Sequence, residues 1–242
     1  MNQIDHSSAW DFFDRIYCIS LRERIDRRRQ ALEQFQRVGL ASRVEFVMVE
    51  RHPLDCEQGI YESHQQCIRR GLATDADTIL IFEDDVMFER FNAERLIRCA
   101  AFLQARSDWK AFFLGCLSQK SRKTEAESVA EISYRCLAHA YALNRPFAET
   151  VARKPWCKVP FDGMIESFAG GFYAMYPACA FQSDAPSDNF NHRLLDGFRR
   201  CMGGLKRIQK VNEWRLANRN LLVALHLAAL LALAVWAWRA WS

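Results

Sequence analysis

The stretch that decides the fold is Thr78-Ile79-Leu80-Ile81-Phe82-Glu83-Asp84-Asp85-Val86-Met87-Phe88, in which three acids interrupt an apolar run. Apolar residues on both sides predict a buried strand, and buried strands do not normally carry three carboxylates. Ionised carboxylates persist there when an opposite charge compensates them, and a divalent cation is the usual one. Because residues i and i+2 of an extended segment share a face, Glu83 and Asp85 would lie together. The pattern indicates a hard cation that carries a substrate phosphate and takes one or two protein carboxylates.

A different account of the three acids needs no metal. They would then cap a following helix or pair with arginines.

Strands and helices alternate along the rest of the chain. Apolar or β-prone runs predict strands at residues 15–21, 44–49, 78–88, 111–117 and 138–143. Helical spacing predicts helices at residues 24–38, 59–73, 92–104 and 145–152, and residues 118–128 are expected to form a loop. The helix at 59–73 is expected to begin near Ser63, whose hydroxyl would cap it. This alternation predicts an α/β fold with a mostly parallel central sheet.

Length and charge narrow the class of protein. At 242 residues the chain suits one sizeable α/β domain. Residues 191–242 contain nine Lys/Arg and two Asp/Glu and so carry +7, which leaves −3 on residues 1–190. The basic residues are not interleaved with stacking aromatics, so we expect no nucleic-acid partner.

The cysteines and the N-terminus indicate an intracellular location. Nine cysteines are scattered along the chain and none forms a Cys-x-x-Cys pair, which gives no support for a zinc or redox motif. An odd, scattered set fits a reducing compartment. The first ten residues contain no basic segment followed by an apolar one, so no secretion through an N-terminal signal is expected.

The C-terminal segment has the composition of a membrane anchor. Residues 221–238 carry no formal charge and are interrupted only by His226. As a helix they would span roughly 27 Å, close to the bilayer hydrocarbon thickness of about 30 Å. Trp residues flank the segment on both sides, as in interfacial aromatic belts. The alternatives are a buried helix of the domain and an in-plane amphipathic helix, although the apolar residues cover every face.

The charges around this segment predict its orientation. Five basic residues precede it and Arg239 alone follows it, which places the N-terminal body in the cytoplasm. The preceding basic residues are Lys206, Arg207, Lys210, Arg215 and Arg219.

An ordered set of short motifs resembles glycosyltransferase family 25, which includes bacterial lipo-oligosaccharide galactosyltransferases and collagen galactosyltransferases. The first motifs are Ile19-Ser20-Leu21, Asp26-Arg27-Arg28, Gly59-x-Tyr61-x-Ser63-His64 and Leu80-Ile81-Phe82-Glu83-Asp84-Asp85-Val86. The later ones are His139-Ala140-Tyr141, Pro160-x-Asp162, and Pro177 followed by Gln182 and Ser187-Asp188. The resemblance covers roughly residues 12–190.

This resemblance implies a GT-A-like single domain, a nucleotide-sugar donor (most often UDP-galactose) and inversion at the anomeric carbon. Glu83-Asp84-Asp85 would be the chain's version of the DxD motif. Asp85, with Glu83, would bind Mn²⁺ or Mg²⁺, while Glu83 or Asp84 would face the ribose or a metal-bound water. The implied organisation is a glycosyltransferase domain at 1–190, a basic helical connector at 191–219 and a transmembrane anchor at 220–239.

Four further residues are candidates for donor binding. Arg27 and Arg28 follow the first strand, where a planar guanidinium can meet a diphosphate, although a solvated helix face is the alternative. Ser63 and His64 would reach the donor from the second helix, with a structural histidine as the alternative. His139 is a candidate further metal ligand on the acceptor half.

An inverting transferase needs a general base for the acceptor hydroxyl. Asp162 is the leading candidate because it lies within the resemblance and beyond the metal strand, and Asp184 and Asp188 are rivals. The chain departs from the family pattern at Ser20, where Asn is frequent. It departs again at Glu50-Arg51-His52-Pro53, where an Asp-Gly step is frequent. These departures leave the identity of the donor open.

The sequence therefore predicts a cytoplasm-facing, membrane-tethered glycosyltransferase that moves a hexose from a UDP-sugar to a glycan or a lipid-linked saccharide, and the resemblance implies galactose and lipopolysaccharide biosynthesis. Two rivals are a non-catalytic membrane scaffold that retains the fold and a metal-dependent phosphoryl-transfer enzyme.

Overall fold

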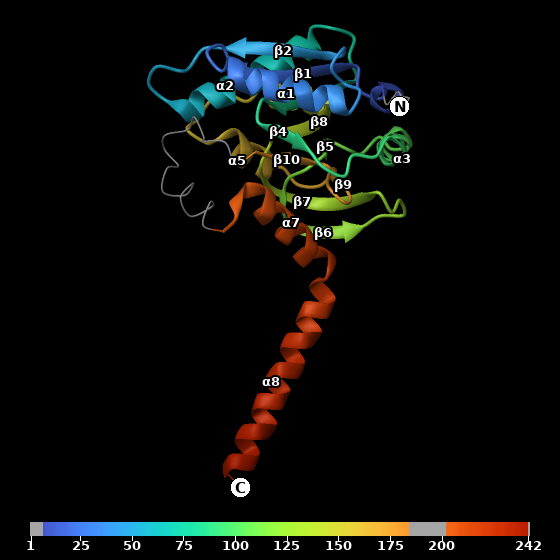
Figure 1. Ribbon diagram of the computed structural model, residues 1–242, viewed down its shortest axis with the longest axis vertical. Coiled ribbons are helices and arrows are strands. Elements are labelled where there is room, and N and C mark those ends of the chain that lie inside the picture. The colour runs from blue at the N-terminus through green and yellow to red at the C-terminus, as the bar shows by residue number, and fades with distance from the viewer. Residues whose placement is uncertain (1–6, 184–201, 242) are drawn as a thin grey trace.

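An eight-stranded mixed sheet forms the centre of the structure, a computed structural model that describes residues 7–183 and 202–241 (Figure 1). In order across the sheet, the strands are β2 (Val44–Val49), β1 (Arg15–Leu21), β3 (Thr78–Glu83), β8 (Ala140–Asn144), β5 (Ala111–Phe113), β9 (Phe172–Met175), β7 (Val129–Cys136) and β6 (Leu117–Lys123). All of these strands except β7 and β8 run in the same direction. The predicted α/β class with mostly parallel strand directions is confirmed.

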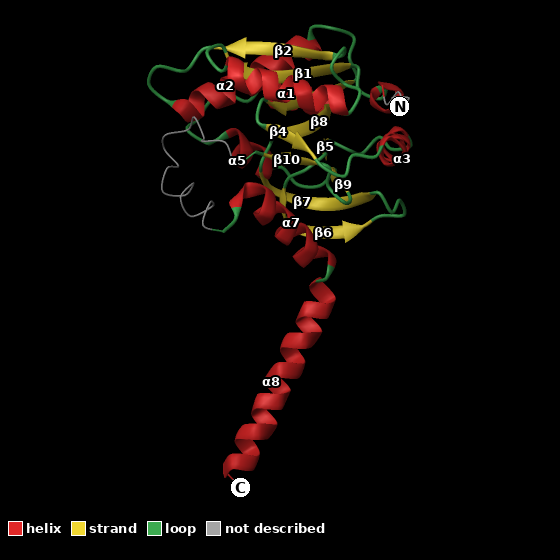
Figure 2. Cartoon of the chain, in the orientation of Figure 1, coloured by secondary structure: helices red, strands yellow, loops and turns green. Residues whose placement is uncertain are grey.

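Helices cover both faces of this sheet (Figure 2). The 3-10 helix η1 (Ser7–Trp10) and helices α1 (Ile25–Arg37) and α3 (Ala93–Gln104) pack on one face. Helices α2 (Cys56–Leu72), α4 (Arg145–Ala152) and α5 (Phe161–Glu166) pack on the other. Strand β3 is buried on both sides, because Leu80 and Phe82 belong to the first core and Ile79 and Ile81 to the second. A strand buried on both faces has a continuous apolar run, as residues 79–82 do.

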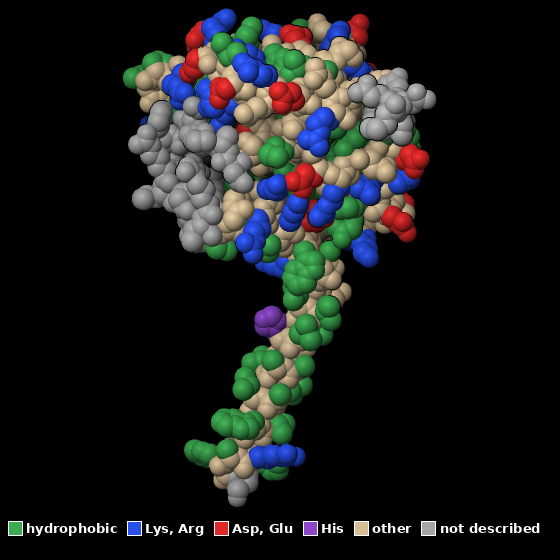
Figure 3. Space-filling view, viewed as in Figure 1, with side chains coloured by type: hydrophobic (Ala, Val, Ile, Leu, Met, Phe, Trp, Pro, Cys, Tyr) green, Lys and Arg blue, Asp and Glu red, His purple; other side chains and the backbone are tan. Residues whose placement is uncertain are grey.

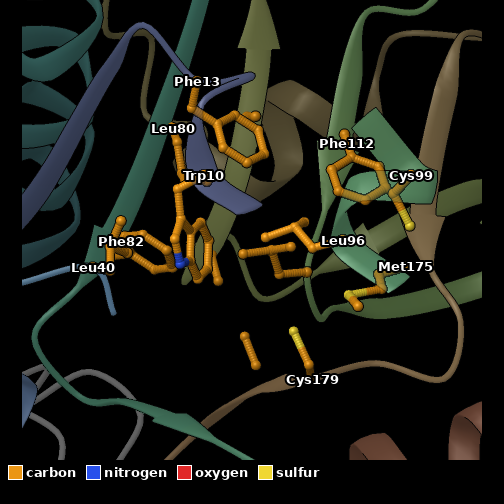
Figure 4. Packing of buried hydrophobic residues seen from close by; sticks show 14 of the residues in the cluster. Trp10, Phe13, Leu40, Leu80, Phe82, Leu96, Cys99, Phe112, Met175 and Cys179 are labelled. Carbon is orange, nitrogen blue, oxygen red and sulfur yellow. The ribbon is translucent and has the colours of Figure 1, made fainter. Parts of the chain in front are cut away.

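The first core is built around Trp10. Its ring stacks on Phe91 with centroids 5.3 Å apart, and its indole N–H donates to the carbonyl of Val38 at 2.9 Å. Figure 4 shows Trp10 beside Phe82 and Leu40 within this cluster. The N-terminal turn is thereby fixed against the end of α1 and against β3, the strand that leads into the acidic segment.

The apolar run at 78–88 is divided by a turn. Strand β3 ends at Glu83, Asp84 and Asp85 form the turn, and β4 (Val86–Phe88) pairs antiparallel with β10 (Ala180–Gln182) in a separate two-stranded sheet. The apolar run therefore forms two short strands that belong to different sheets. The acids lie at the carboxyl end of β3, where they reach a pocket.

Two local predictions were wrong. Residues 118–128 contain most of β6, which forms an antiparallel pair with β7 where a loop was expected. An edge strand with exposed polar side chains lacks the apolar run by which strands are predicted from sequence. Helix α2 begins at Cys56, not near Ser63, because the Asp55 carboxylate accepts from the Glu57 and Gln58 backbone N–H groups and caps the helix.

The chain ends in helices α7 (Gly204–Ala217) and α8 (Arg219–Trp241). Helix α7 lies against β6 and β10, and three of its polar side chains, those of Gln209, Asn212 and Glu213, hydrogen-bond to backbone groups there. The backbone partners are Ala180 O, Ser118 N and O, and Ala178 N. Residues 202–217 therefore include a helix that is docked on the domain.

Helix α8 extends away from the domain (Figure 1). It has 23 residues and no buried one, so it does not serve as a core helix of this chain. Within the described residues it is the one helix long and apolar enough to cross a membrane.

Candidate functional site

A pocket of 290 Å³ lies at the carboxyl ends of β1, β2 and β3. Leu21, Val49 and Glu83, at or beside these strand ends, line it. The chain passes from β1 through α1 to β2 on one side, and then through α2 to β3 on the other side of β1. The direction of strand order reverses here, and open α/β sheets bind ligands at the carboxyl ends of strands where this reversal occurs.

Seven of the residues singled out in the sequence line this pocket. They are Arg27, Ser63, His64, Glu83, Asp84, Asp85 and Asp162. They come from α1, α2, the turn after β3, and α5, which are far apart in the sequence and converge on the strand ends.

Glu83 and Asp85 lie against one amide. The side-chain N–H₂ of Gln182 donates to Glu83 Oε2 at 3.0 Å and to Asp85 Oδ2 at 3.3 Å. Burial is the main cause that raises the pKa of both carboxyls to about 8, and their mutual repulsion adds to it for Asp85. The other oxygen of Asp85, Oδ1, is buried and has no hydrogen-bond partner. Two neighbouring carboxylates with an unsatisfied oxygen are a place where positive charge would be strongly favoured.

Asp84 turns toward Arg27, on the first turn of α1. Arg27 Nη1 lies 3.4 Å from Asp84 Oδ1 and 3.8 Å from Asp85 Oδ2, and both side chains of the closer pair are almost fully buried. Burial raises the pKa of Asp84, and the Arg27 guanidinium opposes that rise. Pairing with arginine, the metal-free account of the acids, thus describes Asp84 well. It does not describe Glu83, whose carboxylate contacts Gln182 and His64.

His64 joins the acidic turn to the second core. Its Nδ1 lies 3.0 Å from the Tyr141 hydroxyl, its Nε2 lies 3.3 Å from Glu83 Oε1, and its ring stacks on Phe161 at 4.2 Å. Burial lowers the pKa of His64 to about 4, so the imidazole is neutral at pH 7. A proton on Nε2 would donate to Glu83 while Nδ1 accepts from Tyr141, which satisfies both nitrogens.

Ser63 and Arg28 have local bonding roles. The Ser63 hydroxyl lies inside α2 and donates to the carbonyl of Gly59 at 2.6 Å, although the residue still borders the pocket. Arg28 is not among the residues that line the pocket. Its guanidinium donates to the carbonyls of Leu21 at 2.7 Å and Arg22 at 2.9 Å and so holds the turn between β1 and α1.

Asp162 lies in the first turn of α5 and supports the opposite wall. Its carboxylate accepts from the Tyr134 hydroxyl and from the backbone N–H groups of Leu137 and Ala138, at 3.0 and 3.1 Å for the latter two. The carboxylate therefore fixes the segment that leads into β8. Asp184 and Asp188, the rival bases, lie outside the described residues.

His139 does not reach the pocket wall. It is fully buried, its Nδ1 lies 3.2 Å from the carbonyl of Leu137, and burial lowers its pKa to about 4. Its backbone carbonyl accepts from the N–H of Glu83 at 3.0 Å. The structure thus connects His139 to the acidic segment through the backbone.

Gln182 is the site residue to which the sequence assigned no role. It is the last residue of β10, and it reaches the acids because β10 pairs with β4, which follows them directly. The divergent segment at 50–53 also lies at the pocket, where Glu50, Arg51 and His52 border it. A local sequence pattern does not predict a long-range contact such as that of Gln182 with the acids.

The carboxylates of Glu83 and Asp85 suit a metal ion whose remaining ligands come from a substrate. No group of three or more His, Cys, Asp and Glu side chains forms a metal cage among residues 7–183 and 202–241. Glu83 and Asp85, with the orphaned Oδ1 of Asp85, instead match the one or two carboxylates by which Mg²⁺ is typically held beside substrate phosphates.

No protein-family model matches the chain, and no curated protein matches it. Among solved structures, A197 from STIV is similar over 69% of this chain and 84% of that chain, at 15% identity and a TM-score of 0.45. A glycosyltransferase involved in glycosylation of the major capsid of PBCV-1 is similar over 72% and 94%, at 11% identity and 0.44. The mannosyltransferase PcManGT from Pyrobaculum calidifontis, in complex with GDP-Man and Mn²⁺, is similar over 95% and 86%, at 12% identity and 0.38. Similarity at this level assigns neither a family nor an activity.

Proposed function

We propose that the chain is a metal-assisted, GT-A-like glycosyltransferase that moves a hexose from a nucleotide-diphosphate sugar to a glycan or lipid-linked saccharide. The observation that carries this proposal is the acidic turn after β3. Its three carboxylates lie where the strand order reverses, in a pocket that also contains Arg27 and His64. The motif resemblance to glycosyltransferase family 25 supports UDP-galactose as the donor and inversion as the stereochemical outcome.

Glu83 and Asp85 would hold Mn²⁺ or Mg²⁺, which when bound neutralises charge on the departing diphosphate. Arg27 is buried beside Asp84 and Asp85, and its planar guanidinium is suited to a phosphate oxygen next to them. His64 in its neutral form donates to Glu83 and keeps that carboxylate turned toward Asp85. Apolar Ile19, Leu21 and Val49, together with the divergent segment, would receive the nucleoside.

Asp162 is the proposed general base. The acceptor oxygen would attack the anomeric carbon as the bond from that carbon to the diphosphate breaks and its electron pair leaves with the nucleotide. The acceptor proton would pass to the Asp162 carboxylate. Since this carboxylate already accepts three hydrogen bonds, its orientation is fixed before substrate arrives.

Membrane tethering by α8 would suit an acceptor that is itself confined to a membrane. Attachment of enzyme and acceptor to one surface raises their effective concentration. The basic residues before α8 and the lone Arg239 near its end support a cytoplasmic catalytic domain.

The test is a donor screen with purified full-length protein. Nucleotide sugars of different bases and hexoses are supplied with and without Mn²⁺, and mass spectrometry identifies the products. A glycoside or metal-dependent donor hydrolysis is expected, first with UDP-galactose, and Asp85→Ala should abolish it while Asp75→Ala, an exposed carboxylate, should not. A phosphorylated acceptor would instead identify phosphoryl transfer. If no donor gave turnover or metal-dependent nucleotide binding, the remaining interpretation would be a non-catalytic scaffold.

A further inference from the structure

Helix α7 has an unusual distribution of side chains. The side that faces the domain forms its hydrogen bonds through Gln209, Asn212 and Glu213, which contact the backbone of β6 and the segment around β10, and it also carries the partly buried Leu205 and Leu216. The opposite side carries Val211, 54% exposed, and Trp214, 57% exposed. A surface helix of a soluble domain normally does not present large apolar side chains on its outward side. An apolar stripe that faces outward from a docked helix indicates that something other than water covers it.

Basic residues lie on the same side of α7. Arg207 and Arg215 are exposed, and with Val211 and Trp214 they are spaced by four, three and one residues, which places all four on one stripe. An outward stripe of Trp, an aliphatic residue and arginines is the composition found at the headgroup level of membranes.

Strand β6 extends this surface from a distant part of the chain. It is the last strand of the sheet and contacts α7 through the bonds between Ser118 and Asn212. Lys120 and Lys123 are exposed on opposite faces of this edge strand, opposite Ser133 and Ala130 of β7, and neither forms an ion pair with a described residue. Figure 3 shows Lys and Arg side chains gathered where α8 leaves the domain. We call Lys120, Lys123, Arg207, Val211, Trp214 and Arg215 the juxtamembrane face.

Four acids near this face are already engaged within the domain. Glu131 pairs with Arg122, Glu166 with Arg135, and Glu89 with Lys206 and Lys210. Glu213 is turned inward to the N–H of Ala178. No ion pair among the described residues joins a basic side chain of the juxtamembrane face to a carboxylate.

The position of helix α8 indicates which partner the juxtamembrane face meets. The helix begins at Arg219 and is separated from the end of α7 at Ala217 by Asn218 alone, so Trp214 and Arg215 are within about two helical turns of the apolar span. We propose that the juxtamembrane face binds anionic lipid headgroups of the membrane that α8 enters, so that the domain rests on the bilayer surface. The proposal depends on membrane insertion of α8, which is part of the proposed function. The lysines and arginines would contact the headgroups, and Trp214 would lie at the interface.

The test uses the full-length protein in lipid nanodiscs, with a photo-crosslinking amino acid in place of exposed Val211. One set of discs contains phosphatidylcholine alone, and the other adds phosphatidylglycerol. We expect a lipid adduct whose yield is several-fold higher in the anionic discs and falls in high salt, which screens exposed charges. Lys120→Glu/Lys123→Glu should reduce that yield roughly tenfold, since each lysine near an anionic surface contributes measurably to binding.

The matched control is Arg29→Glu/Arg153→Glu, which makes the same change in charge. Arg29 lies on α1, which Figure 1 shows at the end of the domain away from α8. Arg153 caps α4, which packs on α2. The control should leave the adduct yield unchanged. Amide hydrogen exchange of residues 117–123 gives a second readout and should be slower in anionic discs.

Three results would overturn the proposal. Equal adduct yields in neutral and anionic discs, or an unchanged yield in Lys120→Glu/Lys123→Glu, would exclude headgroup binding by this face. Adducts between two copies of the chain would identify the face as a protein interface instead. Failure of the full-length protein to float with neutral vesicles would remove the anchor itself, and this outcome is distinct because the first two leave flotation intact.

Discussion

At the scale of single residues, the acidic turn combines groups that oppose each other in the absence of a cation. Glu83 and Asp85 share the amide of Gln182, and burial disfavours their ionised forms. Arg27 compensates mainly Asp84, to which it is closest. A site of this kind is expected to lose stability as its carboxyls ionise and to regain it when a divalent cation binds.

In metal-free protein, the free energy of unfolding should fall as the pH rises from about 6.5 to about 8. In this interval the folded chain keeps protons on Glu83 and Asp85 that the unfolded chain has already released, so stability decreases with pH. His64 has the opposite effect, because its lowered pKa makes stability rise with pH, but that effect ends near 6.5. Urea denaturation in chelator at several pH values measures this slope. Glu83→Gln/Asp85→Asn should flatten it, and an equally steep slope in that variant would contradict the assignment.

Manganese should stabilise the protein through Asp85. A ligand that binds only the folded state at 100 times its dissociation constant adds about 2.7 kcal/mol. We expect Mn²⁺ with nucleotide diphosphate to raise the thermal midpoint of the wild type and of Asp75→Asn, but not of Asp85→Asn. An identical shift in Asp85→Asn would mean that the metal binds elsewhere.

Asp162 has a structural and a proposed catalytic role, and two substitutions separate them. Asp162→Asn removes the base and should lower kcat by about 10² or more. Tyr134→Phe removes one of the three hydrogen bonds to the carboxylate but leaves the base, and should lower stability by about 1 kcal/mol with kcat nearly unchanged. Steady-state kinetics with thermal melts measure both. Retention of kcat in Asp162→Asn would leave Asp162 as an anchor only.

At the scale of elements, the small sheet of β4 and β10 is what completes the site. It holds Gln182 against the acids, and α7 in turn holds β10 through Gln209, which donates to the carbonyl of Ala180. Gly115 lies at the same point, between β5 and β6. A side chain there would have no room, because a Cβ on Gly115 would lie 1.8 Å from the Ala180 oxygen and 2.6 Å from the Gln209 amide.

Gly115→Ala should therefore separate β10 and α7 from the sheet. The clash involves backbone, so we expect a loss of more than about 2 kcal/mol in unfolding free energy and faster hydrogen exchange in β10. Gly163→Ala is the control, because its Cβ would meet only the Val159 methyl at 3.2 Å and Val159 is 40% exposed. Equal stability of the two variants would show that the backbone at Gly115 adapts freely.

At the scale of the whole molecule, the chain divides after α7. Hydrogen bonds from Gln209, Asn212 and Glu213 join α7 to the domain, whereas α8 has no buried residue. We therefore expect a cut near Asn218 to change how the chain partitions, and a cut before Gly204 to lower its stability.

Two truncations test this division. A chain that ends at Asn218 should move from the membrane to the soluble fraction and keep the thermal midpoint of the domain. A chain that ends at Gly203 also loses α7, and its midpoint should be several degrees lower because backbone groups near β10 lose their partners. Equal partitioning of the full-length and Asn218-terminated chains would contradict the anchor.

The sequence predicted those parts of the protein that local pattern controls. Strands β1, β2 and β3 and helix α1 lie where period and apolar runs place them, because a segment buried on a face must present apolar residues at the matching spacing. The same logic missed β6, whose exposed side chains carry no such signal. It also placed the start of α2 too late, although Asp55 was a readable cap.

By itself, then, the sequence determined the α/β class, the three acids at a buried strand and the apolar C-terminal helix, because each of these features follows from the pattern of residues that are close together in the chain. Tertiary structure alone decided that Arg27 faces Asp84 while Arg28 holds a turn, that Gln182 joins Glu83 to Asp85, and that β6 and α7 form one basic face. The physical reason is that side-chain direction after a turn, and contact between distant segments, depend on how whole elements pack and not on the residues beside them.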